Sequence, residues 1–244
     1  MLVLAGHDPS GGAGIQADIE TIHSLGGHAL TAITALTLQD SRGVYAFQSV
    51  SADWLRRQAD ILLADFQPAA VKIGMIAEAS LVPVIVDIVR QLPDVPVVYD
   101  PVLAGNLHGS LIHPGFCEAL PPLLQCTTLL TPNVPELQIL LKDQPLTSLF
   151  AQGIRYLLCK GGHQPGALIV NELFDRNGCL YQQTTPRLAA EFHGSGCTLA
   201  AACAINLAQG QPMPVAVANA LQFTTACLNS AFTPGHGQKF PRRS

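Results

Sequence analysis

The chain has few charged residues for its length. Of its 244 residues, 12% are Asp, Glu, Lys or Arg, whereas soluble domains usually carry about 25%. Apolar residues make up 48% of the chain, which excludes a disordered protein. The length is sufficient to bury a large core in one or two domains. Because so little charge is left to cover the surface, we expect an apolar interface between subunits.

Blocks of positive charge are also lacking. The 13 Lys and Arg residues are outnumbered by 17 Asp and Glu residues, and the formal net charge is −4. A nucleic-acid-binding domain normally shows a basic patch or stripe. The composition therefore argues against nucleic acid as a partner.

The seven cysteines form no C-x-x-C pair, which argues against a zinc site or a disulfide framework. The first apolar run, residues 1–5, is too short for a secretory signal. We therefore expect a cytoplasmic protein. Residues 192–238 carry no charge, but Gly, Gln, Asn, Thr and Pro interrupt this stretch too often for a membrane-spanning helix. Buried helices explain it better, and no membrane contact is expected.

Short strand-like runs alternate with longer helical segments along the chain. Strands are predicted at residues 1–5, 29–38, 70–73, 95–99, 128–130 and 156–159, with an antiparallel pair at 167–174 and 180–183. Helices are predicted at 15–25, 51–66 (with Ser51 as N-cap), 79–91, 115–124, 135–142, 197–208 and 214–231. This alternation predicts a single α/β domain over residues 1–244 with a mainly parallel sheet. Ligands of such sheets bind beyond the carboxyl ends of the strands.

A glycine-rich loop, residues 6–14, follows the first predicted strand. Its four glycines allow the backbone to approach a ligand closely, and Asp8 and Ser10 add polar groups. The alternative is a simple turn between a strand and a helix. The patterns G-x-G-x-x-G and G-x-x-x-x-G-K-[ST] are both absent, so neither a dinucleotide-binding site nor a P-loop is supported.

A second run of small residues, 194–196, precedes the helix predicted from Cys197. Backbone N–H groups and the dipole at a helix N-terminus bind anions, which suits phosphoryl transfer. The same field is expected to lower the pKa of Cys197 from about 8.5 and to make it a reactive base. The alternative for a cysteine is burial in the core, which fits Cys203 and Cys227.

Polar residues follow several other predicted strands. Lys160 either neutralises a nucleotide phosphate or lies solvated in a turn. Asp100, Asn133 and Glu136 supply the hard oxygen atoms that Mg²⁺ prefers, often through water, and Asn133 also suits a helix N-cap. Gln39 ends the second strand, where its amide either pairs with a heterocycle that carries an amino group or forms ordinary polar surface.

Seven segments in order along the chain carry a resemblance to one known family. They are residues 5–18, 31–40, 71–75, 100–103, 131–136, 160–163 and 193–199. Together they resemble the hydroxymethylpyrimidine/phosphomethylpyrimidine kinases of thiamine biosynthesis, within the ribokinase-like superfamily. The resemblance extends to residues 235–237 and covers nearly the whole chain. The first and last segments are the specific ones, because sugar kinases of this superfamily have Asp in the position of Cys197.

The resemblance implies a fold, a partner and a reaction. The fold is a three-layer α/β sandwich with a small β edge, and the protein is a homodimer. The reaction is the phosphorylation, by ATP with Mg²⁺, of 4-amino-5-hydroxymethyl-2-methylpyrimidine and then of its monophosphate. The implied roles are substrate binding for Gln39, Met75, Gly12 and Asp18; an anion hole at Gly194, Ser195 and Gly196 with Cys197 as base; ATP binding for Lys160, Asn133, Glu136 and Asp100; and water-mediated Mg²⁺ contact for Asp100 and Glu136.

Two other functions stay open. Pyridoxal kinases of the same superfamily share these motifs, and a catalytically silent pyrimidine-binding protein would keep the fold. A cysteine hydrolase is less supported, because no G-x-S-x-G motif is present. The chain departs from the family at Phe192, where Thr is usual, and in the short stretch between His163 and Asn177. Both regions border the nucleotide site or the second-step phosphate in the family.

Overall fold

The computed structural model describes residues 1–103 and 115–244. The strands are β1 (Leu2–His7), β2 (Leu30–Gln39), β3 (Val44–Ser49), β4 (Val71–Ile73), β5 (Val97–Tyr99), β6 (Leu129–Leu130), β7 (Tyr156–Cys159), β8 (Leu168–Asp175) and β9 (Gly178–Pro186). The helices are α1 (Gly14–Ser24), α2 (Ala52–Asp65), α3 (Val82–Arg90), α4 (Phe116–Ala119), α5 (Pro121–Gln125), α6 (Val134–Leu141), α7 (Thr147–Ala151), α8 (Ser195–Ala208) and α9 (Met213–Asn229). Two 3₁₀ turns, η1 (Ala79–Leu81) and η2 (Gly161–His163), complete the described elements.

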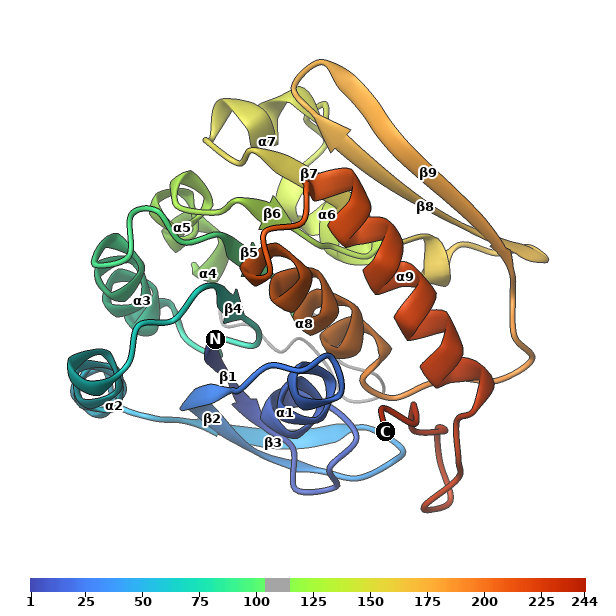
Figure 1. Ribbon diagram of the computed structural model, residues 1–244, viewed down its shortest axis with the longest axis horizontal. Helices are drawn as coiled ribbons and strands as arrows, with labels where there is room; N and C mark the ends of the chain where they lie inside the picture. Colours follow the sequence, from blue (N-terminus) through green and yellow to red (C-terminus); the bar gives the residue numbers. More distant parts are fainter. Residues whose placement is uncertain (104–114) are drawn as a thin grey trace.

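These strands form one sheet in the order β3-β2-β1-β4-β5-β6-β7-β8-β9. Neighbouring strands from β2 to β7 are parallel, whereas β3, β8 and β9 pair antiparallel at the two edges. Helices α1, α8 and α9 lie over one face, and α2, α3 and α5 lie over the other (Figure 1). The structure thus confirms the predicted three-layer α/β fold with a mainly parallel sheet.

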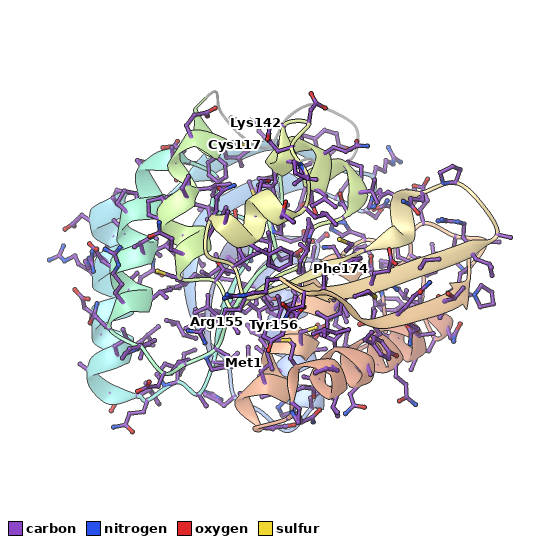
Figure 2. All side chains as sticks on the ribbon, turned by 90° about the horizontal axis from the view of Figure 1, so that it is seen from above. Met1, Cys117, Lys142, Arg155, Tyr156 and Phe174 are labelled. Atoms are coloured by element: carbon purple, nitrogen blue, oxygen red, sulfur yellow. The ribbon has the colours of Figure 1, made fainter. Side chains whose placement is uncertain are left out.

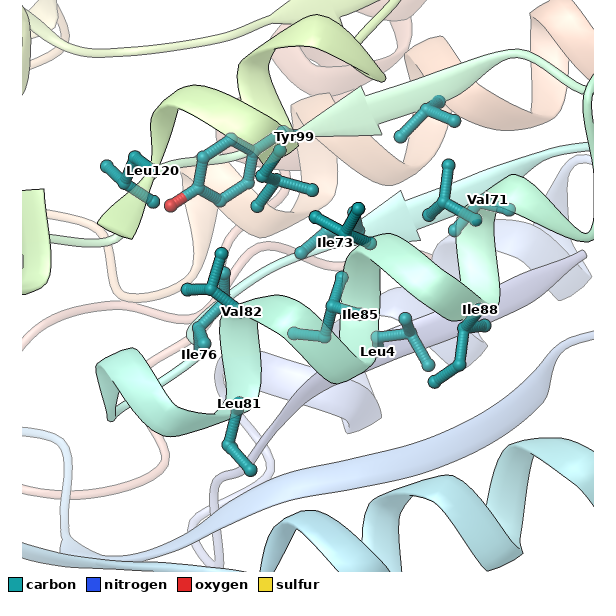
Figure 3. Close-up of a cluster of buried hydrophobic side chains, with 14 of the residues drawn as sticks. Leu4, Val71, Ile73, Ile76, Leu81, Val82, Ile85, Ile88, Tyr99 and Leu120 are labelled. Atoms are coloured by element: carbon teal, nitrogen blue, oxygen red, sulfur yellow. The ribbon is translucent and has the colours of Figure 1, made fainter. Parts of the chain in front are cut away.

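The helices on the two faces of the sheet pack against it with side chains of different size. On one face, branched side chains of α3 such as Ile85 and Ile88 meet Val71 and Ile73 of β4 (Figure 3). On the other face, α8 presents a fully buried run of alanines, residues 200–202. These small side chains allow α8 to lie between the sheet, α1 and α9. The uncharged stretch of the sequence therefore builds buried helices, as predicted.

The structure corrects the prediction in three places. The helix expected at 115–124 is two short helices, α4 and α5, which meet at Leu120. Pro121 begins the second of them, because proline has no N–H to donate to a preceding turn and its ring obstructs that turn. Strand β3 and helix α7 were not predicted.

Direction along the sheet decides where a site can lie. Met1 and Tyr156 stand at the amino ends of β1 and β7 and lie toward the same end of the molecule (Figure 2). The loops after the strands therefore gather at the opposite edge. None of the described helices is long and apolar enough to cross a membrane.

One charged pair lies inside the core beneath that edge. Lys72 is the central residue of β4, and because its neighbours face α3, its side chain points to the opposite face of the sheet. There its Nζ lies 2.8 Å from Oδ2 of Asp18 on α1, and neither side chain is exposed. The pair joins the sheet to α1 at a point where water cannot replace either partner.

Removing one member of this pair is expected to destabilise the fold strongly. Lys72→Met leaves the Asp18 carboxylate buried without its counter-charge, which costs about 3–5 kcal/mol of unfolding free energy. The double variant Lys72→Met/Asp18→Leu removes both charges and should recover most of that loss, as measured by urea denaturation. A double variant as unstable as the single one would show that the ion pair is not the cause.

Candidate active site

The polar residues that follow the parallel strands meet at the carboxyl edge of the sheet. Asp100 follows β5, Asn133 follows β6 and Lys160 follows β7. The pairing of β6 with β7 continues as a parallel bridge between Asn133 and Lys160, and the Lys160 N–H donates to the carbonyl of Pro132 at 2.9 Å. Strand register therefore places these predicted residues beside one another.

Lys160 is the centre of a compact charged cluster. Its Nζ lies 2.7 Å from Oδ1 of Asp100 and 4.0 Å from Oε2 of Glu136. The hydroxyl of Thr131 donates to the same oxygen of Asp100 at 3.2 Å. Burial alone would lower the pKa of Lys160, but the charges of Asp100 and Glu136 outweigh it and raise that pKa. The lysine is therefore a fixed positive charge.

Glu136 also takes part in the cap at the start of α6. Its Oε2 accepts from the Asn133 N–H at 2.8 Å, and Asn133 Oδ1 accepts from the Glu136 N–H at 2.9 Å. This reciprocal pair is a capping box, which confirms the N-cap role considered for Asn133. Burial raises the pKa of Glu136 to about 7, with Lys160 opposing the rise and Asp100 adding to it.

The N-terminus of α8 reaches this cluster. A Cβ atom added at Gly196 would lie 3.3 Å from Nζ of Lys160 and 3.6 Å from Oδ2 of Asp100. The first turn of the helix, with N–H groups that have no carbonyl partner within the helix, thus faces a fixed lysine charge. This combination of an ammonium group and free backbone donors suits a phosphate.

The glycine-rich loop after β1 is organised by Asp8. Its carboxylate accepts from the Ser10 N–H and the Ala13 N–H, both at 2.8 Å, and from the Ser10 hydroxyl at 2.7 Å. It also lies 2.8 Å from Nε2 of His193, in the loop before α8. Burial alone would raise the pKa of Asp8, but these hydrogen bonds and the His193 charge lower it to about 2.

The two loops touch through their backbones. A Cβ atom added at Gly194 would overlap the carbonyl oxygen of Gly12, and Gly194 has a φ of +79°, which favours glycine. A Cβ atom added at Gly12 would overlap the His193 ring and lie 2.6 Å from Cζ of Phe240. Glycine at both positions therefore permits the loop after β1 to lie against the first turn of α8.

Cys197 differs from its expected state. It lies in the first turn of α8 and is partly buried. Enclosure by the protein raises the pKa of this thiol to about 11; Lys72 opposes the rise, while Asp18 and Asp100 add to it. The predicted thiolate at neutral pH is therefore wrong, because loss of hydration and two carboxylates outweigh the field of the helix.

The residues assigned to substrate binding fall into two groups. Gln39 ends β2 and is half-buried, and Met75 packs with its Sδ 3.4 Å from where a Cβ atom at Gly6 would lie. Met75 therefore borders the glycine-rich loop, whereas Gln39 lies beyond the last residue of β2 that pairs with β1. Asp18, by contrast, has no exposed surface and pairs with Lys72. The expectation that Asp18 lines the pocket is not met, because α1 and the sheet enclose its carboxylate.

Sequence reasoning missed several residues of this region. Lys72 lies in the family-like segment 71–75, and the sequence analysis gave it no role, although a lysine inside an apolar strand indicates a buried partner. His193 lies in the segment 193–199 and was likewise given no role, because its contact with Asp8 spans 185 residues.

A cavity of about 530 Å³ opens nearby. Among the described residues, it is lined by Arg42, Glu191 and a C-terminal segment, and none of the predicted site residues lines it.

Comparison with known proteins agrees with this geometry. A family model described as phosphomethylpyrimidine kinase matches residues 8–241. The hydroxymethylpyrimidine/phosphomethylpyrimidine kinase of Streptomyces coelicolor is 35% identical, with 97% of this chain and 91% of that protein covered. The thiamine biosynthesis multifunctional protein ThiED of Corynebacterium efficiens is 36% identical, and this chain spans 32% of its length.

A solved structure gives the same result for the fold. The pyridoxal kinase of Staphylococcus aureus, in complex with AMP-PCP and pyridoxal, superposes with a TM-score of 0.88 at 26% identity. The superposition covers 99% of this chain and 92% of that one. On the match over residues 8–241 and a relative of similar length at 35% identity, this chain belongs to the phosphomethylpyrimidine kinase family.

Proposed function

We propose that this chain uses ATP to phosphorylate the hydroxymethyl oxygen of 4-amino-5-hydroxymethyl-2-methylpyrimidine and then to phosphorylate the resulting monophosphate. The observation that carries the proposal is the meeting of the α8 N-terminus with Lys160 beside the glycine-rich loop. Preorganised N–H donors and a fixed positive charge stabilise the transferring phosphoryl group. The names of the relatives support the pyrimidine as substrate.

The substrate ring is proposed to lie between Gln39 and Met75, above Gly12. The Gln39 amide both donates and accepts, which matches an amino group next to a ring nitrogen. Met75 offers an apolar, polarisable surface to the face of the ring. The ring is thereby oriented so that its hydroxymethyl group points toward Cys197.

The residues around Lys160 also suit Mg²⁺ carried by ATP. Asp100 and Glu136 present carboxylate oxygens, the donor type that Mg²⁺ takes, often through water. The described residues contain no group of three His, Cys, Asp or Glu side chains able to hold a metal by themselves, so ATP phosphates would complete the coordination. When bound, the ion neutralises phosphate charge. Lys160 and the α8 N–H groups hold the phosphates in place, and Asn133 keeps Glu136 oriented.

Cys197 is proposed as the proton acceptor. The substrate oxygen forms a bond with the γ-phosphorus, the bond from that phosphorus to the β,γ-bridging oxygen breaks, and ADP leaves. The hydroxyl proton passes to the Cys197 thiolate, which becomes the neutral thiol. Residues Gly194, Ser195 and Gly196 supply the anion hole.

ATP turnover with separate acceptors tests this function. We expect ADP release with the pyrimidine alcohol and with its monophosphate, both faster than with pyridoxal. Faster turnover of pyridoxal would make the chain a pyridoxal kinase, the second candidate that the likeness to the Staphylococcus aureus structure favours. No turnover with any acceptor would leave a silent binding protein and overturn the proposal.

The raised pKa of Cys197 gives the activity a defined pH dependence. Because the base form is the thiolate and the pKa is about 11, kcat/KM should rise as the pH increases from 7 to 10. Cys197→Ser should lower kcat by about 10²–10⁴ while KM stays nearly unchanged. Cys197→Asp should shift the rising limb toward acidic pH, as measured by steady-state kinetics.

Cys203→Ala provides the control for this prediction. Cys203 is fully buried in the core beneath α9, so its loss removes a thiol without touching the site. Its variant should keep both the pH profile and kcat. A Cys197→Ser enzyme with the wild-type kcat and profile would show that the substrate hydroxyl needs no cysteine base.

We also propose that the protein is a homodimer in the cytoplasm. The described chain exposes large apolar side chains on β2 and α2, with Leu38 65% and Ile61 73% exposed, and Leu36 and Trp54 nearby in sequence on the same elements. We propose that these exposed apolar side chains form the interaction surface. All seven cysteines are unpaired, which agrees with a reducing compartment.

Sedimentation tests the dimer. We expect a mass of twice 25.8 kDa for the wild type at micromolar concentration, and 25.8 kDa for Leu38→Asp, because a charge in the interface cannot be desolvated without a partner. Leu168→Asp, at a site on β8 that is 55% exposed, is the matched control and should stay dimeric. A monomeric wild type would contradict the proposal.

A further inference from the structure

Among the described residues outside the candidate active site, Arg243 and the Lys72–Asp18 pair are the most buried charged side chains. Its side chain is 2% exposed. It reaches the interior from an irregular segment after α9, close to α1, where the C label stands in Figure 1. A guanidinium group is rarely buried unless acceptors match its donors. Its surroundings therefore indicate what it does.

The guanidinium donates to three different elements. Nη2 donates to the carbonyl oxygen of Gly12 at 2.5 Å, Nε donates to Oγ1 of Thr198 at 2.8 Å, and Nη1 lies 3.0 Å from Oε2 of Glu20. These acceptors belong to the glycine-rich loop, the first turns of α8 and helix α1. Three donors of one planar group thus fix three elements relative to one another.

Two of these contacts lie where the glycine-rich loop packs against the start of α8. The Gly12 carbonyl is the group against which Gly194 packs. The Thr198 hydroxyl, which accepts from Arg243, donates in turn to the carbonyl of Gly194 at 2.9 Å. Arg243 therefore reaches both sides of the contact between Gly12 and Gly194.

The segment that carries Arg243 is itself anchored. The Arg242 N–H donates to the Cys227 carbonyl at 3.0 Å, the Ser24 hydroxyl donates to the Arg243 carbonyl, and the Phe240 ring lies 5.4 Å from the His193 ring. Because the backbone is held on both sides of the side chain, the guanidinium has little freedom to move away. It serves as a fixed fork rather than a mobile charge.

We propose that Arg243 is a positioning residue for phosphoryl transfer, which holds the Gly12 loop against the first turn of α8 so that substrate and anion hole stay aligned. The inference rests on the proposed kinase function for its kinetic part. Arg243 contacts neither Lys160 nor Cys197 in the described structure; it acts through the backbone of Gly12 and through Thr198. A loss of alignment lowers the rate of transfer more than the binding of ATP.

Kinetics of Arg243→Met and Arg243→Lys test this role. Arg243→Met should lower kcat by about 10²-fold, with the KM for ATP nearly unchanged. Arg243→Lys keeps the charge but loses the fork, so it should lie between Arg243→Met and the wild type. Arg242→Met is the matched control, because Arg242 lies over the Phe232 ring, and it should keep the wild-type kcat.

A second measurement does not depend on activity. If Arg243 holds the loops together, Arg243→Met and Arg243→Lys should both allow iodoacetamide to reach Cys197 several-fold faster at fixed pH than in the wild type or in Arg242→Met. Since Arg243→Lys retains a cation at this position, it can be measured even if Arg243→Met does not fold.

The outcomes separate the two proposals. A wild type that turns over none of the acceptors overturns the kinase function, and the alkylation rates then decide the role of Arg243. If the wild type is active and the Arg243 variants keep both the wild-type kcat and the wild-type alkylation rate of Cys197, the role of Arg243 is overturned and the kinase function stands. A loss of unfolding free energy without either change would show that Arg243 serves stability only.

Discussion

The site depends on a backbone contact between two loops that are far apart in the sequence. Gly12 and Gly194 touch without an intervening side chain, and a methyl group at either position would push the loops apart. Two features of the site follow from this contact: the α8 N-terminus lies beside the glycine-rich loop, and Asp8 reaches His193. Small errors in such positions are costly, because misplacement of reacting groups by about 1 Å can cost 10²-fold in rate.

Charge is scarce in this chain, and several of its buried charges belong to this region. Lys160 is shared by Asp100 and Glu136, and Lys72 is paired with Asp18. In the proposed reaction, a phosphate at Lys160 would compete with the Asp100 carboxylate for the same ammonium group. The Lys72–Asp18 pair fixes α1 against the sheet and does not bind a ligand, since neither side chain is exposed.

The sequence was sufficient for the features that depend on neighbours in the chain. Strand and helix alternation predicted the parallel sheet, the strand-like runs at 167–174 and 180–183 predicted the β8–β9 hairpin, and the position of Asn133 before α6 indicated a cap. It was insufficient wherever three-dimensional enclosure decides. The pKa of Cys197 is raised above all by burial, with Lys72 opposing the rise and Asp18 and Asp100 adding to it, and a helix-terminus argument contains none of these effects.

The order of the strands has a consequence for how the molecule is made. Starting from β1, each later parallel strand is added next to its predecessor in the series β4, β5, β6 and β7, and β8 and β9 extend the same edge. A growing chain can therefore extend the sheet stepwise during synthesis, in the order in which the ribosome releases it. The loop before α8, which carries the proposed anion hole, follows all nine described strands. Translation thus delivers these strands before the segment that brings the N-terminus of α8 to the edge of the sheet.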